Sequence, residues 1–165
     1  MGFVSDKIKG ENAEDSVAKI LSCHWDVHKA SDLETGAFSD WDLSVAQLGT
    51  GCEIFTVEVK YDEMQHLTGN IAIEFYNCKS NKPSGLSATK ADLWCHVLKE
   101  STWMTSVKKL KDFCENKKPF RTITGGGDGN ASIFLYNTKD IIKIFERVDN
   151  CSKEQLMKKI ESLLK

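Results

Sequence analysis

Two acidic residues and one lysine between positions 40 and 60 have the types and the spacing of a metal-assisted hydrolytic site. Asp42 leads directly into the mostly apolar run 43–46, and Glu58 and Lys60 stand two residues apart near the end of the run 52–60. Carboxylate oxygens suit Mg²⁺, which keeps water and phosphate oxygens as its other ligands. A nearby lysine can orient the attacking water and stabilise the charge that develops in the transition state. These residues therefore predict a site where a metal ion binds phosphate oxygens and water attacks the phosphorus.

A β-hairpin is the element that must position these three side chains. The two β-like runs are joined by the turn Gln47-Leu48-Gly49-Thr50-Gly51, which is a hairpin pattern. Successive side chains leave opposite faces of a strand, so Glu58 and Lys60 share one face. A hairpin also brings the start of its first strand beside the end of its second. The pattern therefore predicts that Asp42 converges with Glu58 and Lys60 at one edge of a sheet.

These residues resemble the catalytic core of the PD-(D/E)XK nuclease superfamily. Glu58-Val59-Lys60 matches the E-X-K element, and Asp42 stands where the first acidic ligand is expected, with Trp41 in place of the proline. The resemblance implies that Asp42, Glu58 and the main-chain carbonyl of Val59 hold Mg²⁺, for which Mn²⁺ can substitute. It also implies that Lys60 serves the attacking water. Asp40 competes with Asp42 for the first position, and Asp42 is preferred because it leads directly into the apolar run.

A helix expected from Ser5 to Leu21 offers a further acidic residue. The fragment Lys9-Gly10-Glu11-Asn12-Ala13-Glu14 resembles the opening helix of archaeal Holliday-junction resolvases and their relatives. In that group a glutamate on this helix reaches the metal cluster, which implies that Glu14 is an auxiliary catalytic residue, with Glu11 second. Glu74 is another candidate, because a charge inside an apolar strand is costly unless it is exposed or paired.

A loop and a short helix after the expected core sheet offer contacts for DNA. The segment K-P-S-G-L-S-A-T-K-A-D-L-W, residues 82–94, resembles one in phage-type and restriction-like members of the same superfamily. Lys82 and Lys90 suit phosphate contacts, and Ser87 or Thr89 can cap a short helix whose hydroxyls and N–H groups bind phosphate. DNA is therefore the implied partner.

Composition limits the class of protein without deciding its activity. The chain has 165 residues, 41% hydrophobic and 28% charged, which is typical of one globular domain over 1–165. The net charge of −2 does not indicate nucleic-acid binding, but a local group of cations can still attract phosphate. Six cysteines without a C-x-x-C pair and without a secretion signal predict an intracellular, cytoplasmic protein with reduced thiols. No run is long enough to cross a membrane, and the glycine-rich segment 125–129 matches no phosphate-loop or organic-cofactor fingerprint.

The expected elements add up to an α/β fold of restriction-endonuclease-like type, with a mixed central sheet and helices on both faces. Besides the hairpin, strands are expected at 25–30, 70–78, 93–98, 103–107 and 132–136. Helices are expected at 5–21, 106–116, 138–148 and 152–164, and loops at 31–39, 79–85 and 122–130. His96 falls in an apolar run and is expected to be a core histidine with its hydrogen bonds satisfied.

Two other functions remain open from the sequence. The first is a catalytically inactive nuclease-fold protein that binds nucleic acid or a protein partner, although the complete Asp-Glu-Lys set argues against it. The second is a cysteine-dependent enzyme that uses Cys23 or Cys95 with a histidine. The sequence also leaves open a homodimer, which is common among such nucleases, as well as the DNA structure that is cut and the choice between DNA and RNA.

Overall fold

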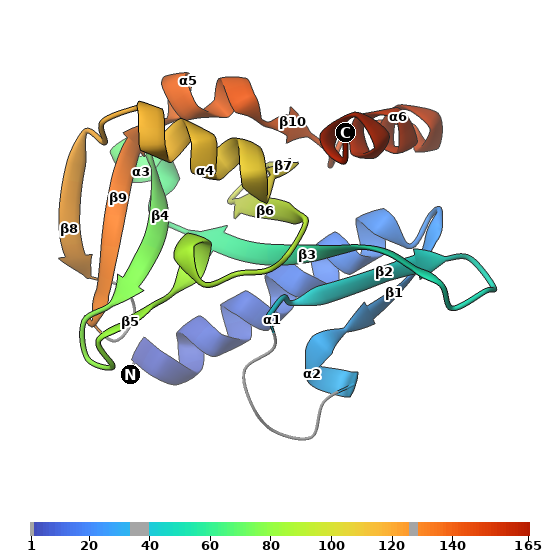
Figure 1. The fold of residues 1–165 in the computed structure, drawn as a ribbon, viewed down its shortest axis with the longest axis horizontal. Coiled ribbons are helices and arrows are strands. Elements are labelled where there is room, and N and C mark those ends of the chain that lie inside the picture. Colours follow the sequence, from blue (N-terminus) through green and yellow to red (C-terminus); the bar gives the residue numbers. More distant parts are fainter. Residues whose placement is uncertain (1, 34–39, 126–128) are drawn as a thin grey trace.

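The computed structural model describes residues 2–33, 40–125 and 129–165, which form two sheets and the helices that cover them (Figure 1). The larger sheet has six strands in the order β1-β2-β3-β6-β7-β10. Its strands are β1 (Trp25–Lys29), β2 (Leu43–Gln47), β3 (Glu53–Asp62), β6 (Leu93–Leu98), β7 (Thr102–Ser106) and β10 (Glu146–Arg147). The pair β3–β6 is parallel and the other pairs are antiparallel. The predicted α/β class with a mixed sheet flanked by helices is therefore confirmed.

The smaller sheet has four antiparallel strands in the order β5-β4-β9-β8. Its strands are β4 (Asn70–Asn77), β5 (Lys82–Pro83), β8 (Arg121–Gly125) and β9 (Ala131–Asn137). One central sheet was expected, and the division into two is a correction to that expectation. It arises because the strands predicted near 70–78 and 132–136 pair with each other and not with the hairpin.

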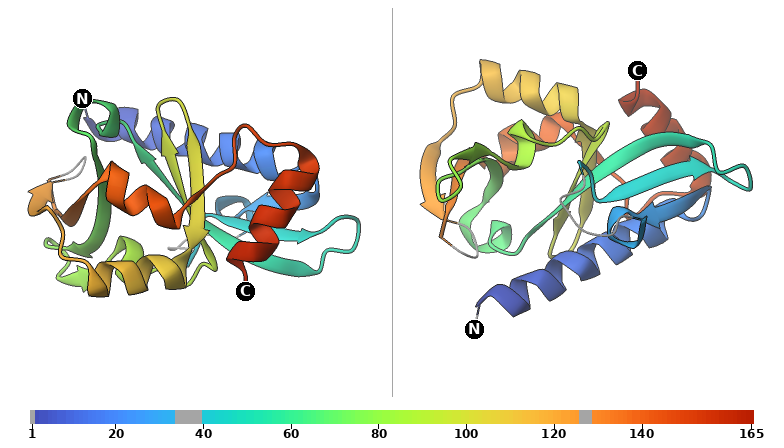
Figure 2. Two further views of the ribbon diagram at one scale, coloured as in Figure 1. Left: turned by 90° about the horizontal axis from the view of Figure 1, so that it is seen from above. Right: turned by 60° about the horizontal axis from the view of Figure 1, so that its bottom comes forward.

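Helices lie on both faces of the larger sheet (Figures 1 and 2). The described helices are α1 (Gly2–Leu21), α2 (Ala30–Leu33), α3 (Gln65–Thr68), α4 (Val107–Asn116), α5 (Thr138–Ile141) and α6 (Lys153–Leu163), with 3₁₀ turns η1 (Gly85–Ser87) and η2 (Ile142–Ile144). Of these, α3 and η1 lie against β4 of the smaller sheet. Ser106 caps α4, and Ser152 forms a capping box with Gln155 at the start of α6, as the start signals in the sequence predict. No helix in the described part of the chain is long and apolar enough to cross a membrane.

The two faces of β3 belong to different environments. Val57 and Val59 point into a core shared with α1 and α6, where Val17 and Ile160 are fully buried. The opposite face of the sheet carries Trp94, which packs in a second core with α4, α5 and the smaller sheet. Because side chains alternate along a strand, Glu58, Lys60 and Asp62 all point toward the smaller sheet.

Two expectations about the C-terminal third are wrong. The helix expected at 138–148 is only α5 and η2, and the chain then pairs as β10 with β7. The Thr105 hydroxyl donates to the Ile144 carbonyl at 2.7 Å, so a tertiary contact satisfies a group that a longer helix would bond internally. The loop expected at 122–130 is instead strand β8 up to Gly125, while 126–128 and most of the loop expected at 31–39 lie outside the described residues.

A glycine fixes the close packing of η1 on β4. Gly85 has a positive φ of 49°, and a Cβ at this position would lie 2.4 Å from the Glu74 carbonyl oxygen. The register of β4 against β9 shifts between Glu74 and Tyr76, which is the mark of a β-bulge. The bulge and the glycine together allow η1 to lie directly against the backbone that carries Glu74.

Candidate active site

The hairpin brings Asp42, Glu58 and Lys60 together, as the sequence predicts. The Asp42 main-chain N–H donates to the Val57 carbonyl at 3.0 Å, and the Val59 N–H donates to Asp42 Oδ2 at 2.7 Å. These two bonds hold the Asp42 carboxylate beside β3, where Glu58 and Lys60 leave the strand on one face. Asp42 therefore converges with the E-X-K residues at the end of the hairpin.

Asp40, the competing candidate, points elsewhere. Its carboxylate pairs with the Lys90 ammonium at 2.8 Å on the surface. Its main-chain carbonyl accepts from the Lys90 N–H at 3.1 Å. Asp40 therefore fixes the segment around Lys90 and does not face Glu58.

Glu58 is a buried carboxylate, 8% exposed, with a partner on each oxygen. Its Oε1 lies 2.5 Å from the Lys60 ammonium, and its Oε2 accepts from the Thr89 hydroxyl at 3.0 Å. Burying a charge is costly unless it is paired and hydrogen-bonded. Lys60 and Thr89 therefore supply the partners that a buried carboxylate needs at this position.

The ionised form of Asp42 is disfavoured by its surroundings. Burial raises the pKa of Asp42, and the neighbouring Glu58 carboxylate raises it further, while Lys60 and the Val59 N–H act in the opposite direction. The net result is a pKa above the ordinary value for aspartate. A further positive charge beside Asp42 and Glu58 would offset this effect of burial and favour the ionised form of Asp42.

Lys60 is a cation at neutral pH. Its burial disfavours the ammonium form, but the carboxylates of Glu58 and Asp42 outweigh this effect, so the pKa of Lys60 lies above its usual value. About a third of the side chain, 34%, is exposed, and the ammonium lies 5.9 Å from the centre of the Trp94 ring. A protonated Lys60 can donate hydrogen bonds to water or phosphate, but it cannot accept a proton.

A cavity of about 700 Å³ opens in front of these residues. Asp42, Lys60 and Glu14 contribute to one side of it, and side chains of the smaller sheet form another. The volume is within the ~300–1,000 Å³ range of small-ligand sites. Asp42, Lys60 and Glu14 therefore face a concave site and not a flat surface, whereas Glu58, paired with Lys60, is not among the residues that line it.

Glu14 is the helix glutamate that reaches this cavity. Burial, and the Asp42 carboxylate after it, raise the pKa of Glu14 to about 7, although Lys29 at 3.8 Å opposes the shift. Glu11, the second candidate, lies at the surface near Lys7. Glu74 also lines the cavity from the smaller sheet and adds to the negative potential around Lys60.

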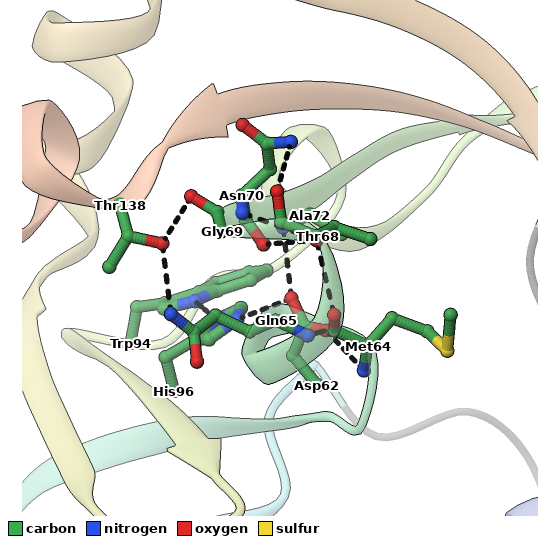
Figure 3. Close-up of polar contacts among 10 residues, drawn as sticks. All are labelled: Asp62, Met64, Gln65, Thr68, Gly69, Asn70, Ala72, Trp94, His96 and Thr138. Atoms are coloured by element: carbon green, nitrogen blue, oxygen red, sulfur yellow. Dashed lines mark hydrogen bonds and ion pairs between the residues drawn. The ribbon is translucent and has the colours of Figure 1, made fainter.

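A second polar cluster lies deeper in the same cavity wall (Figure 3). Asp62 is 7% exposed and accepts from the main-chain N–H groups of Met64, Gln65 and Ala72 at 3.0–3.1 Å. His96 is 1% exposed, and its Nε2 lies 3.4 Å from Asp62 Oδ2. The prediction that His96 is a satisfied core histidine is confirmed.

The tautomer of His96 follows from its other neighbour. The Trp94 indole N–H donates to His96 Nδ1 at 3.2 Å, so Nδ1 accepts and Nε2 carries the proton in the neutral ring. Nε2 then donates to Asp62, whose pKa stays below its usual value because these hydrogen bonds outweigh the effect of burial. This cluster was missed from the sequence, although Asp62 follows Lys60 by two residues and so had to share its face.

The residues predicted to bind nucleic acid do not gather at the cavity. Thr89 is buried and its hydroxyl is engaged with Glu58. Lys82 in β5, Ser87 in η1 and Lys90 are exposed, and none of the three lines the cavity in front of Lys60. Thr89 therefore has a positioning contact to Glu58, and phosphate contacts by all four residues stay a prediction.

Magnesium is compatible with the donors at this site. The Asp42 carboxylate lines the cavity, and the Glu58 carboxylate lies close enough to act on the pKa of Asp42. Mg²⁺ is commonly bound through one or two carboxylates while water and substrate phosphates complete its shell. Within residues 2–33, 40–125 and 129–165, no three His, Cys, Asp or Glu side chains form a metal-binding group by themselves. The donor set therefore suits a hydrated cation and not a cation enclosed by protein ligands. The Val59 side chain is buried in the core, and a role for its carbonyl stays a prediction.

Cys95 is poorly suited to the cysteine-dependent alternative. The side chain is fully buried, and burial raises the pKa of the thiol far above its usual range. The nucleophile in such enzymes is the thiolate. Cys23 is half-buried and its thiol donates to the Ile20 carbonyl at the end of α1, so neither residue forms a cysteine–histidine pair in the described structure.

Comparisons with known proteins give one structural similarity. No protein-family model matches the chain, and no curated protein is significantly similar to it. Among solved structures, a bacterial homing endonuclease, I-Ssp6803I, aligns over 77% of this chain and 88% of its own, with a TM-score of 0.48 and 17% identity. A similarity at this level assigns neither a family nor a function.

Proposed function

We propose that this protein is a Mg²⁺-dependent nuclease of PD-(D/E)XK type that hydrolyses phosphodiester bonds in DNA. The observation that carries the proposal is the convergence of Asp42, Glu58 and Lys60 at the end of the hairpin, with Asp42 and Lys60 lining a cavity. Buried carboxylates with a raised pKa beside a specific charge partner are typical of functional sites. A structural ion pair of Glu58 and Lys60 alone would not need Asp42, whose ionised form is disfavoured there by burial.

Each residue has a distinct proposed role. Asp42 and Glu58 hold the metal, with the Val59 carbonyl as a further ligand, and a bound Mg²⁺ supplies charge stabilisation and lowers the pKa of a water. Lys60 donates to the attacking water and to the phosphate. Glu14 adds negative charge from α1 and so strengthens the attraction for the metal.

The test is DNA cleavage with a matched pair of substitutions. Purified protein is incubated with plasmid, linear and four-way-junction DNA in Mg²⁺, Mn²⁺ or EDTA. We expect cleavage in both metals and none in EDTA. Asp42→Asn should abolish cleavage and also the rise in Tm that Mg²⁺ produces by mass action. Asp40→Asn removes an equal charge two residues away and should leave both nearly unchanged.

Three outcomes would overturn this assignment. Cleavage that persists in EDTA contradicts the metal, and an active Asp42→Asn contradicts the proposed ligand. A protein that binds DNA and gains no stability from Mg²⁺ would instead be the inactive nuclease-fold binder that the sequence leaves open. Melting curves with and without Mg²⁺ separate that case from a failure to find the right substrate.

A further inference from the structure

We propose that the smaller sheet provides a seat for an unpaired base, so that the enzyme acts on strands in which the nucleotide beside the scissile phosphate is not base-paired. This inference rests on the proposed nuclease function and names the substrate class of the same site. The seat is an aliphatic shelf formed by Ala72, Ile123, Ile133 and Leu135, which line the cavity together with Asp42 and Lys60.

Strand register places the shelf on one face of the smaller sheet. Leu135 of β9 is directly opposite Ala72 of β4, and Ile133 is directly opposite Ile123 of β8. Residues that pair across strands share a face, as do residues two apart along a strand. Ile123 and Leu135 remain partly exposed. The shelf is therefore a continuous apolar surface that starts within the catalytic cavity.

The charges of the cavity disfavour a duplex lying flat against this wall. The carboxylates that line the cavity are Glu14, Asp42, Asp62, Glu63 and Glu74, and the cations are Lys9 and Lys60. A duplex presents phosphates and sugars on its outside and keeps the faces of its bases stacked inside. Those phosphates would meet an acidic and aliphatic wall. An unpaired nucleotide offers instead the flat, weakly polar face of its base.

The shelf can also contact any of the four bases without distinguishing between them. Its four side chains offer no hydrogen-bond donor or acceptor, so they can contact a base face but cannot read its edge. Arg121, opposite Leu135 and on the same face, is exposed at the edge strand β8. It can contact the phosphate next to the seated base. We therefore expect preference for unpaired structure without strong sequence preference.

The experiment compares one sequence in three forms: a full duplex, the same duplex with a short unpaired bubble, and the single strand. We expect kcat/KM at least tenfold higher for the bubble and the single strand than for the duplex. Ile123→Thr keeps a β-branched residue but adds a hydroxyl to the shelf. It should raise KM for unpaired DNA about fivefold and leave kcat nearly unchanged. The matched control Ile54→Thr alters a strand residue that is 48% exposed and does not line the cavity, and it should behave as the parent.

A gain of binding gives the sharper test. Ile123→Phe places an aromatic ring on the shelf, and binding of a fluorescent single strand, measured by anisotropy without divalent metal, should tighten about tenfold, the scale of one base-stacking contact. Duplex binding should not change. Equal kcat/KM for paired and unpaired DNA, or no tightening in Ile123→Phe, overturns the base seat.

Failure of the nuclease proposal would look different. If the parent cuts none of the three substrates and gains no stability from Mg²⁺, the proposed catalysis fails, and the anisotropy measurement still decides the seat. Weaker single-strand binding in Ile123→Thr and tighter binding in Ile123→Phe would support a base seat in a binding protein. No response in either variant would overturn it.

Discussion

Two carboxylates on β3, Glu58 and Asp62, share a face and a degree of burial but differ in every partner. Glu58 is held by a lysine ammonium and a threonine hydroxyl. Asp62 is held by three main-chain N–H groups and a histidine. Both partners of Glu58 are side chains, and a metal ion could take the place of the Lys60 ammonium, whereas three of the four partners of Asp62 are main-chain groups. This difference supports the metal-binding role proposed for Glu58, whereas the contacts of Asp62 are those of a residue that stabilises the fold.

The position of each carboxylate explains the difference. Glu58 lies beside Asp42, and the pKa of Asp42 is raised by burial and by the Glu58 carboxylate even though Lys60 and the Val59 N–H oppose the rise. Asp62 lies at the end of the strand, where the chain turns into α3 and enters the smaller sheet. Its bond to the Ala72 N–H ties β3 to β4. Glu58 therefore adds negative charge beside Asp42, whereas Asp62 accepts hydrogen bonds from main-chain N–H groups.

The strongest test of this contrast is Glu58→Gln. It keeps the shape and an acceptor for Thr89 but removes the charge opposite Lys60. We expect cleavage to fall by ~10³-fold or more because both metal binding and charge balance are lost. The Tm without metal should change little. A variant that cuts DNA normally, or that unfolds, would place Glu58 in the same class as Asp62.

Lys60→Ala should separate the chemical role of this cluster from its metal-binding role. We expect cleavage to fall by ~10²-fold or more, as for the loss of one preorganised electrostatic group. Both carboxylates remain, and without the ammonium they repel each other more strongly. Stability without metal should therefore fall, and the rise in Tm on adding Mg²⁺ should be at least as large as in the parent. If Mg²⁺ no longer stabilises this variant, Lys60 is part of the metal site itself.

Asp62→Asn should give the reverse pattern. An amide places its NH₂ against main-chain N–H donors, so at least one buried donor loses its partner, and loss of the charge weakens the others. We expect the free energy of unfolding to fall by about 3 kcal/mol, which is a drop of roughly 10 °C in Tm for a chain of this size. Activity per folded molecule should stay within severalfold of the parent. A stable but inactive Asp62→Asn protein would contradict the architectural role.

The pH dependence of the Asp62 variant gives a second measurement. The folded-state pKa of Asp62 is depressed, so its contribution to stability is present above the unfolded value of about 3.9. It is lost as the pH falls through the folded-state pKa. The difference in stability between parent and Asp62→Asn should therefore shrink in acid. Urea unfolding at a series of pH values down to 3 measures this difference.

The hairpin site was predictable because every step was local. Strand alternation placed Glu58 and Lys60 together, and the turn at Gly49 and Gly51, both with positive φ, set the return of the chain. The Asp62 cluster depends on partners up to 34 residues away, and no local pattern indicates which histidine will face which carboxylate. Strand β8 was missed for a similar reason, since its exposed residues pair only with β9.

The broken helix after Asn137 shows the limit of periodicity. Ile141, Ile142, Ile144 and Phe145 are apolar enough to indicate a long buried helix. The side chains of Ile141 and Phe145 do pack in the second core. The backbone, however, ends its helix early because β7 offers hydrogen-bonding partners to β10. Pairing between β7 and β10 therefore prevailed over the local helix preference, and the local sequence does not indicate that pairing.

The smallest expected effect concerns Glu14. This residue lines the cavity as Asp42 does, but it comes from α1 and not from the hairpin. Its pKa near 7 means that the folded protein binds a proton more tightly than the unfolded chain, so stability falls as pH rises from about 4.5 to 7. Glu14→Gln removes this dependence. Because the side chain is only partly buried, we expect the variant to gain about 1 kcal/mol, or ~3 °C in Tm, over the parent at pH 8 in EDTA. At pH 5 the two proteins should melt together.

The variant should also need severalfold more Mg²⁺ for half-maximal cleavage, since one carboxylate facing the metal site is gone. Glu11→Gln, on the same helix and paired with Lys7 at the surface, is the matched control and should show neither change. If Glu14→Gln matches the parent in both measurements, Glu14 is a surface residue of α1 and the site consists of the hairpin residues alone.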